Sequence, residues 1–184
     1  STKCNQSVNR SIGGFFMEYE MAIFDTLFDR LMKHEGGYAN NPADPGGETM
    51  WGVTKRVARE YGYTGVMRQL PKATAQQIAD KLYWQAIQGD KLDRAIAWQL
   101  VDAAYNHGNR NAVKMLQRAV GVTDDGIIGN QTLAAVAAMD KNDVLFKFNA
   151  ERIEFFCNIG TFNVFGKGWM RRVAGNLRWA AVDN

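Results

Sequence analysis

The apolar residues at the start of the chain recur at the spacing of one face of an α-helix. This stripe consists of Ile23, Phe24, Leu27, Phe28, Leu31 and Met32. Glu35 follows Leu31 by four positions, so the same face carries a carboxylate at its C-terminal end. Gly36 and Gly37 then favour a left-handed residue that ends the helix. The pattern therefore predicts a helix that stops beside a carboxylate on its buried side.

Helical spacing of apolar residues also dominates the rest of the chain. We expect further helices over residues 55–61, 75–84, 93–106, 111–120, 132–139, 143–157 and 167–182. Thr74 has the residue type and position of an N-cap for the second of these. No segment shows sustained alternation of apolar and polar residues, so the pattern predicts a mostly α fold.

A stretch rich in glycine, proline and asparagine follows the first predicted helix and contains a second carboxylate, Asp44. Such a loop can fold back over the helix end and bring Glu35 and Asp44 to one cleft. Burial would raise the pKa of Glu35, whereas Asp44 stays in polar surroundings. Glycoside hydrolysis uses a protonated acid and an ionised partner of this kind, and Thr49 can position the attacking water. The alternative is a solvated Glu35 that binds a nearby amide or arginine.

The residues around this loop resemble glycoside hydrolase family 108, which includes phage endolysins and bacterial muramidases. The strings that carry the resemblance are His34-Glu35-Gly36-Gly37-Tyr38, Asn41-Pro42-Ala43-Asp44-Pro45-Gly46-Gly47-Glu48-Thr49 and Trp51-Gly52-Val53-Thr54. Glu35, Asp44 and Thr49 also resemble the Glu-Asp-Thr arrangement of phage-type lysozymes, with a shorter gap before Thr49. The resemblance implies a glutamate acid at Glu35, whereas Asp44 is assigned from its spacing. It also implies a lysozyme-like helical fold with at most a small β-hairpin near residues 38–54.

A second motif, Asp102-Ala103-Ala104-Tyr105-Asn106-His107-Gly108, resembles the Ala-Tyr-Asn-x-Gly stretch of lysozyme-like transglycosylases. In those enzymes the stretch lines the sugar cleft opposite the acid. Tyr105 offers an aromatic face and Asn106 an amide with both a donor and an acceptor, and both groups suit a sugar. The alternative is that Tyr105 packs in the core and Asn106 caps the helix.

Aromatic residues are frequent near the proposed cleft. Tyr38 and Trp51 flank the carboxylates in sequence, so we expect them to contact sugar rings. Tyr83 and Trp84 fall at helical spacing and are expected in the core.

A third motif resembles a peptidoglycan-binding module, in which a Leu-Gln pair precedes an Asp-Gly-x-x-Gly-x-x-Thr-Leu turn. Here the residues are Leu116-Gln117 and Asp125-Gly126-Ile127-Ile128-Gly129-Asn130-Gln131-Thr132-Leu133. Asn130 or Thr132 can cap the helix that follows, which is sufficient to explain the turn. No linker precedes this motif, so we expect it to belong to a second lobe over 94–184 that packs with the rest in one compact unit. The preceding segments are then an N-terminal extension over 1–20 and a catalytic lobe over 21–93.

Composition narrows the function classes. The apolar fraction of 46% suffices for a packed core, and no apolar run approaches the length of about 18 residues that spans a membrane. Cys4 and Cys157 are too few for a disulfide framework, and the two histidines make a structural zinc site improbable. We expect no metal and no cofactor.

The net charge of +3 is modest, but the last segment is more basic, with Lys167, Arg171, Arg172 and Arg178 against Asp183. Positive charge favours encounter with polyanions, and an anionic cell envelope suits a muramidase better than nucleic acid does. The alternative is a solvated helix face. We expect a monomer that acts on peptidoglycan glycan strands and neither binds nucleic acid nor inserts stably into a membrane.

These observations predict a muramidase that hydrolyses the β-1,4 bond between N-acetylmuramic acid and N-acetylglucosamine. Residues 1–20 show no signal-peptide pattern, and Met21 reads as a natural start. Such an enzyme would be made in the cytoplasm and act on the wall, with help from a holin if a phage encodes it. A lytic transglycosylase that forms anhydro-sugar ends and a non-catalytic protein that binds wall or assists secretion are the rival interpretations.

Overall fold

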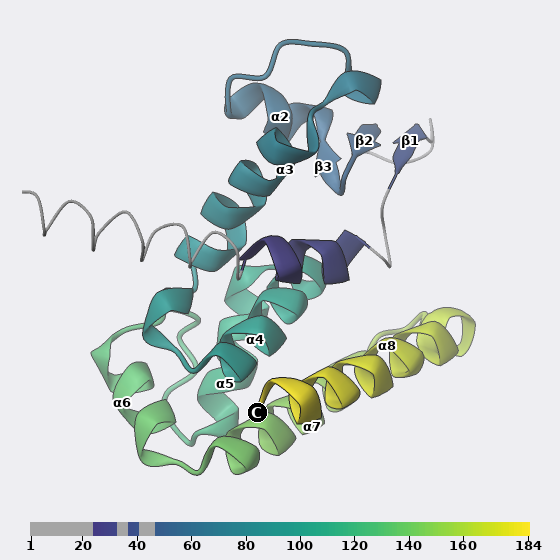
Figure 1. Ribbon diagram of the computed structural model, residues 1–184. Coiled ribbons are helices and arrows are strands. Elements are labelled where there is room, and N and C mark those ends of the chain that lie inside the picture. Colours follow the sequence, from purple (N-terminus) through teal and green to yellow (C-terminus); the bar gives the residue numbers. More distant parts are fainter. Residues whose placement is uncertain (1–23, 33–36, 41–46) are drawn as a thin grey trace, which may run out of the picture. The chain divides into compact units, whose positions relative to one another are not determined.

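The computed structural model describes residues 24–32, 37–40 and 47–184. In this part of the chain helices dominate, and one small antiparallel sheet accompanies them (Figure 1). The predicted mostly α class with a small β element is therefore confirmed. The chain divides into two compact units, Ser1–Asp80 and Lys81–Asn184. The functional lobes predicted over 21–93 and 94–184 stay a prediction.

The first unit opens with a helix over residues 24–32, whose apolar face is buried as predicted. Its buried members are Phe24, Leu27, Phe28, Leu31 and Met32. The polar face of this helix contacts α3 (Lys72–Ala79), where Lys72 binds Asp29 and Gln76 binds Asp25. The helix is thus amphipathic, with a buried apolar face and a polar face that contacts α3.

A three-stranded antiparallel sheet follows in the order β1 (Tyr38–Asn40), β2 (Glu48–Met50) and β3 (Val53–Thr54). A two-residue turn, Trp51-Gly52, joins β2 to β3, and both of its residues have positive φ, at 53° and 71°. Turns of this type match the twist of paired strands, and glycine adopts positive φ without strain. The sheet confirms the small β element expected near residues 38–54.

Two short helices complete the first unit. In α2 (Lys55–Glu60), the Thr54 side chain accepts a hydrogen bond from the Val57 amide. The helix α3 begins after Pro71, whose carbonyl accepts a hydrogen bond from Ala75 N. The predicted N-cap at Thr74 is therefore wrong, because the fixed φ of Pro71 starts the helix earlier and leaves Thr74 in its first turn. A 3-10 turn, η1 (Met67–Gln69), lies between the two helices.

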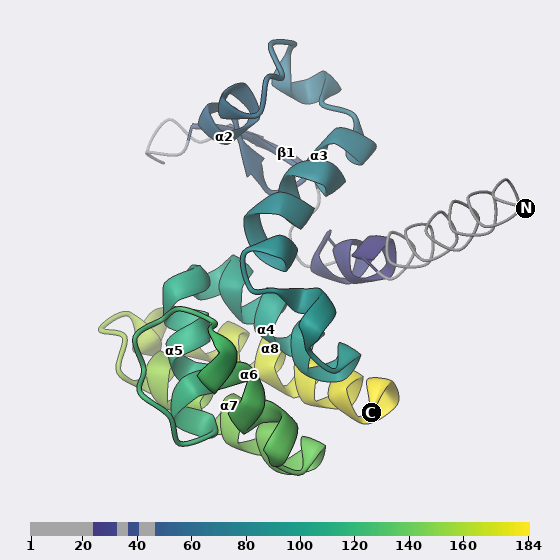
Figure 2. The same ribbon diagram turned by 90° about the vertical axis from the view of Figure 1, so that its left-hand side faces the viewer.

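The second unit surrounds one central helix, α4 (Arg94–His107). Every residue from Ala95 to Ala104 is buried, so α4 is covered on all sides along most of its length. The helices α5 (Asn109–Ala119), α7 (Lys141–Cys157) and α8 (Phe162–Asp183) all pack against it (Figure 2). A π-helical segment, η2 (Asp80–Gln85), and a 3-10 turn, η3 (Gly89–Lys91), precede it.

Local capping accounts for several helix ends in the second unit. Asp93 accepts a hydrogen bond from Ala95 N at the start of α4, and Asp140 does the same for the first turn of α7. The helix α6 (Asn130–Ala138) follows Gly129 without a side-chain cap, so the predicted cap by Asn130 or Thr132 is wrong.

Within the described ranges, no helix combines the length and the apolar character that crossing a membrane requires.

Candidate functional site

The two carboxylates predicted to carry the chemistry, Glu35 and Asp44, lie outside the described residues. Thr49, the third predicted catalytic residue, occupies the middle of β2, where it pairs with Ala39 and Thr54. Both neighbouring strands therefore fix the position of its backbone.

Tyr38, a predicted sugar contact, is held on two sides. Its hydroxyl donates a hydrogen bond to Glu48 Oε1 at 2.8 Å, and the guanidinium of Arg68 lies 3.9 Å from the centre of its ring. A cation over an aromatic face is a favourable electrostatic contact. Since Arg68 covers one face of the ring, that face cannot stack on a sugar.

Glu48 is a charged residue of this region that the sequence reasoning did not single out. Its Oε2 lies 2.8 Å from Lys55 Nζ, so the carboxylate links β2 to the first turn of α2. The hydrogen bonds from Lys55 and then from Tyr38 lower the pKa of the Glu48 carboxyl below its ordinary value. The strand alternation places Glu48 and Thr49 on opposite faces of the sheet.

Trp51 serves the fold of the first unit. Its indole Nε1 donates a hydrogen bond to the Leu70 carbonyl at 3.0 Å, which ties the β2–β3 turn to the segment before α3. Its left-handed backbone, with φ of 53°, belongs to the same turn. Whether Trp51 also contacts sugar stays a prediction.

Tyr105 and Asn106 occupy the last turn of α4 and are both half-buried. The Tyr105 ring contacts that of Tyr83, with 5.4 Å between their centres. The alternative interpretation, in which Tyr105 packs in the core and Asn106 caps the helix, does not describe this turn. Tyr105 is partly exposed, and the C-cap is Gly108, with φ of 79°, rather than Asn106. The related expectation that Tyr83 and Trp84 lie in the core holds for Trp84, whereas Tyr83 is half-buried.

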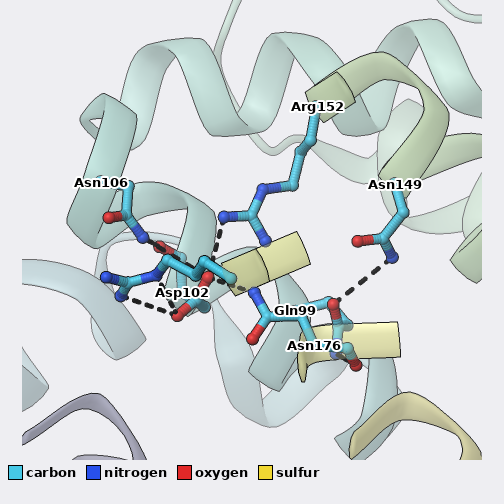
Figure 3. Close-up of polar contacts among 7 residues, drawn as sticks. Gln99, Asp102, Asn106, Asn149, Arg152 and Asn176 are labelled. Atoms are coloured by element: carbon cyan, nitrogen blue, oxygen red, sulfur yellow. Dashed lines mark hydrogen bonds and ion pairs between the residues drawn. The ribbon is translucent and has the colours of Figure 1, made fainter. Parts of the chain in front are cut away.

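Asn106 turns its amide nitrogen back along α4. Its Nδ2 donates to the backbone carbonyl of Asp102 at 2.6 Å and approaches the carboxylate Oδ2 of the same residue at 3.4 Å. Both partners are acceptors, so the NH₂ end of the amide must face Asp102. The carbonyl end of Asn106 points the other way (Figure 3).

Asp102 is the centre of a buried polar cluster that links three helices (Figure 3). From α7, Arg152 Nη2 lies 2.8 Å from Asp102 Oδ2, and from α8, Arg172 Nη2 lies 3.0 Å from Oδ1. Asn176 of α8 donates a further hydrogen bond to Oδ2. Sequence reasoning placed Asp102 within a sugar-binding motif but identified none of these partners, because they follow it in sequence by 50 residues or more.

Burial and charge act in opposite directions on this cluster. Burial is the largest influence on the Asp102 carboxyl and raises its pKa, but the charges of Arg152 and Arg172 outweigh it and hold the pKa below its ordinary value. One carboxylate thus faces two guanidinium groups, and the Arg152 side chain is completely buried. The alternative interpretation of a solvated basic helix face does not describe Arg172, whose side chain is 11% exposed, because Asp102 draws it inward.

His107 borders the same cluster. Its ring packs against Phe155 and Phe156, with centres 4.8 and 4.7 Å away. Burial, followed by the charge of Arg152, lowers the pKa of His107 to about 4. His107 is therefore neutral at neutral pH.

The third sequence motif folds into a closed turn around Gln117. The Gln117 Nε2 donates to Asp125 Oδ1, the Ile127 carbonyl and Thr132 Oγ1, and its Oε1 accepts from Gly126 N. Thr132 is consequently buried rather than free to cap α6. These contacts explain the motif through its role in folding the turn. Independent wall binding by this turn stays a prediction.

Within residues 24–32, 37–40 and 47–184, no three His, Cys, Asp or Glu side chains gather as metal ligands would.

Two families match successive parts of the chain. Residues 28–108 match the family described as Glycosyl hydrolase 108, and residues 111–174 match the Predicted Peptidoglycan domain. A solved structure, titled "Structure of Brucella abortus SagA", superposes with a TM-score of 0.76 at 35% sequence identity. The similarity covers 86% of this chain and 94% of that one. Among curated proteins, none matches the chain.

Proposed function

Because the chain belongs to glycoside hydrolase family 108, we propose that it hydrolyses the β-1,4 bond between N-acetylmuramic acid and N-acetylglucosamine. The coarser activity, a glycosidase that acts on peptidoglycan, is supported by the family match over residues 28–108 and by the peptidoglycan-domain match over 111–174. The observation that carries the proposal is the pairing of these two matches in one chain. The substrate is then the glycan strand of the cell wall.

In this proposal Glu35 is the general acid that protonates the glycosidic oxygen. The buried apolar face over residues 24–32 supports this role, because Glu35 follows the same helical spacing. Asp44 stabilises the oxocarbenium-like transition state or orients water, and Thr49 helps to position that water. The separation of the two carboxyl groups decides the stereochemistry, at about 5–5.5 Å for retention and about 6.5–9.5 Å for inversion.

We assign sugar contacts to Tyr38, Trp51, Tyr105 and Asn106. The partial exposure of the Tyr38 and Tyr105 rings supports stacking. The outward carbonyl of Asn106 supports a hydrogen bond from a sugar N–H or O–H group. The position of Trp51 in the β2–β3 turn, close to Thr49 in sequence, supports a contact between its ring and a sugar.

The variant Glu35→Gln tests the catalytic assignment. Gln keeps the shape of Glu35 but cannot donate the proton, so we expect kcat to fall by about 10²–10⁴-fold. Glu60→Gln is the matched control, because Glu60 is an exposed carboxylate on α2 whose ion pair in the described part of the chain is with Arg56. Release of reducing ends from purified peptidoglycan measures the rate. Undiminished release by Glu35→Gln would show that another group is the acid.

The strongest rival reaction is non-hydrolytic cleavage, as in a lytic transglycosylase, and the motif around Tyr105 and Asn106 favours it. Mass spectrometry of the digested wall separates the two reactions, because hydrolysis adds water whereas transglycosylation leaves a 1,6-anhydro end. A predominance of anhydro products would overturn the hydrolase. If the protein binds wall but releases no sugar, the non-catalytic interpretation is correct.

We propose an endolysin-type role for this activity, in which the enzyme lyses the host of a bacteriophage and has antimicrobial action. The resemblance of the region around Glu35 to phage-type lysozymes supports this setting. Expression in bacteria with and without a holin tests it. Lysis that requires the holin supports the endolysin role, whereas lysis independent of it, or none in either case, contradicts the role.

A further inference from the structure

The buried cluster around Asp102 joins the two segments that match different families. Asp102 and Asn106 lie on α4, within the Glycosyl hydrolase 108 match over residues 28–108. Arg152 on α7 and Arg172 on α8 lie within the peptidoglycan-domain match over 111–174. The second segment therefore supplies both cations that hold a carboxylate of the first.

Asp102 is fixed at both of its carboxylate oxygens. Oδ1 accepts from Arg172 through Nε and Nη2, and Oδ2 accepts from Arg152 and Asn176. The Asp102 side chain is 10% exposed, and in such surroundings charge-assisted hydrogen bonds are strong and directional. A carboxylate held from two other helices has one orientation available to it.

That carboxylate, at 3.4 Å from Asn106 Nδ2, and the backbone carbonyl of Asp102, at 2.6 Å, together set the direction of the Asn106 amide. The Asn106 Nδ2 meets the Asp102 carbonyl and carboxylate, and among the described residues none donates to Asn106 Oδ1. In Figure 3 the Asn106 oxygen points away from Asp102. The amide is thus presented as a fixed acceptor, which suits a ligand that offers an N–H or O–H group.

We propose that Arg152 and Arg172 are positioning residues for substrate binding. They hold Asp102, and through it they orient Asn106 so that its Oδ1 accepts a hydrogen bond from an amide N–H or a hydroxyl of the glycan. The segment that resembles a peptidoglycan domain then serves the sugar-binding end of α4 in addition to any contact of its own with the wall. This inference rests on the sugar contact proposed for Asn106.

A double-mutant cycle between Arg172 and Asn106 tests the inference in the full-length protein. Arg172→Gln leaves Asp102 Oδ1 without its cation, so we expect kcat/KM on solubilised glycan strands to fall about tenfold, mainly through KM. Asn106→Ala should cause a similar loss. If Arg172 acts through Asn106, the double variant loses no more than Asn106→Ala does.

Arg171→Gln is the matched control, because Arg171 is an exposed arginine at the preceding position of α8. Its kcat/KM should stay within about twofold of the parent value. Thermal melting establishes the temperature at which each variant is folded. Arg172→Lys, which keeps the charge but loses the bidentate geometry, is used if Arg172→Gln does not fold. It should show a smaller loss that also vanishes in the Asn106→Ala background.

The outcomes separate this inference from the proposed function. If Asn106→Ala raises KM while Arg172→Gln lowers only the melting temperature, or if the two losses multiply, the positioning role is overturned and the sugar contact stands. If Asn106→Ala leaves KM unchanged, both the contact and the positioning role are overturned. Hydrolysis through Glu35 is tested separately by Glu35→Gln.

Discussion

Each unit of the molecule contains a carboxylate that meets a cation, and the two sites differ in their exposure to water. In the first unit, Glu48 is 22% exposed and its partner Lys55 is 50% exposed. In the second unit, Asp102 is 10% exposed and Arg152 is completely buried. Both carboxyl groups have pKa values below their ordinary range. For Asp102 the charges of two arginines achieve this although burial, the largest single influence, raises the pKa.

This difference decides how much each ion pair matters to the fold. Water and salt screen an exposed pair, and holding two long side chains together offsets much of the attraction. In a buried cluster the removal of one member leaves an uncompensated charge without water. We therefore infer that the pair at Glu48 orients the surface around Tyr38, whereas the cluster at Asp102 specifies how α4, α7 and α8 pack.

The largest expected effect follows from removing the carboxylate of the buried cluster. Asp102→Ala leaves Arg152 and Arg172 facing each other, so we expect the free energy of unfolding to fall by about 3–5 kcal/mol. Urea denaturation measures the change. The control is Asp124→Ala, which removes a half-exposed carboxylate paired with Arg118 and should move the midpoint little. Equal losses in the two variants would contradict the distinction between buried and exposed pairs.

A smaller effect is expected from pH, through His107 beside the cluster. The unfolded chain binds a proton at His107 near pH 6.5, whereas the folded protein binds it only near pH 4. The unfolded state therefore holds more protons between these values, and stability falls as the pH drops from 6.5 towards 4. Below about pH 4 this contribution becomes constant.

Replacement of the histidine isolates its share of the pH dependence. His107→Phe keeps an aromatic ring between Phe155 and Phe156, and among the described residues none forms a hydrogen bond with the buried His107 Nε2. We expect melting temperatures recorded from pH 7 to pH 4 to fall less steeply for this variant than for the parent. Identical slopes would mean that His107 titrates normally in the folded protein.

The smallest expected effect is that of Glu48→Gln. Its partner Lys55 is half exposed, so the midpoint of urea denaturation should change little and should change still less in high salt. The same variant should alter the near-ultraviolet circular dichroism of the Tyr38 region, since the Tyr38 hydroxyl loses a charged acceptor. A loss of stability as large as that of Asp102→Ala would remove the contrast between the units.

Several features were predictable because their causes are local or periodic. The buried stripe from Phe24 to Met32 follows from helical spacing, and it is confirmed. The start of α3 was predicted three residues too late, at residue 75 instead of Lys72, because Pro71 rather than Thr74 precedes the first turn. Glu35 and Asp44 stay predictions, since they lie outside the described residues.

The sequence by itself determined the mostly α class, the small β element near residues 38–54 and the family resemblance around Glu35. Each of these depends on residues that are close together in the chain, where spacing and residue type carry the information. The partners of Asp102 were decided only by the tertiary structure. Arg152 and Arg172 follow Asp102 by 50 and 70 positions. Periodicity indicates which side of a helix is buried, but it does not specify which distant side chain will meet it there.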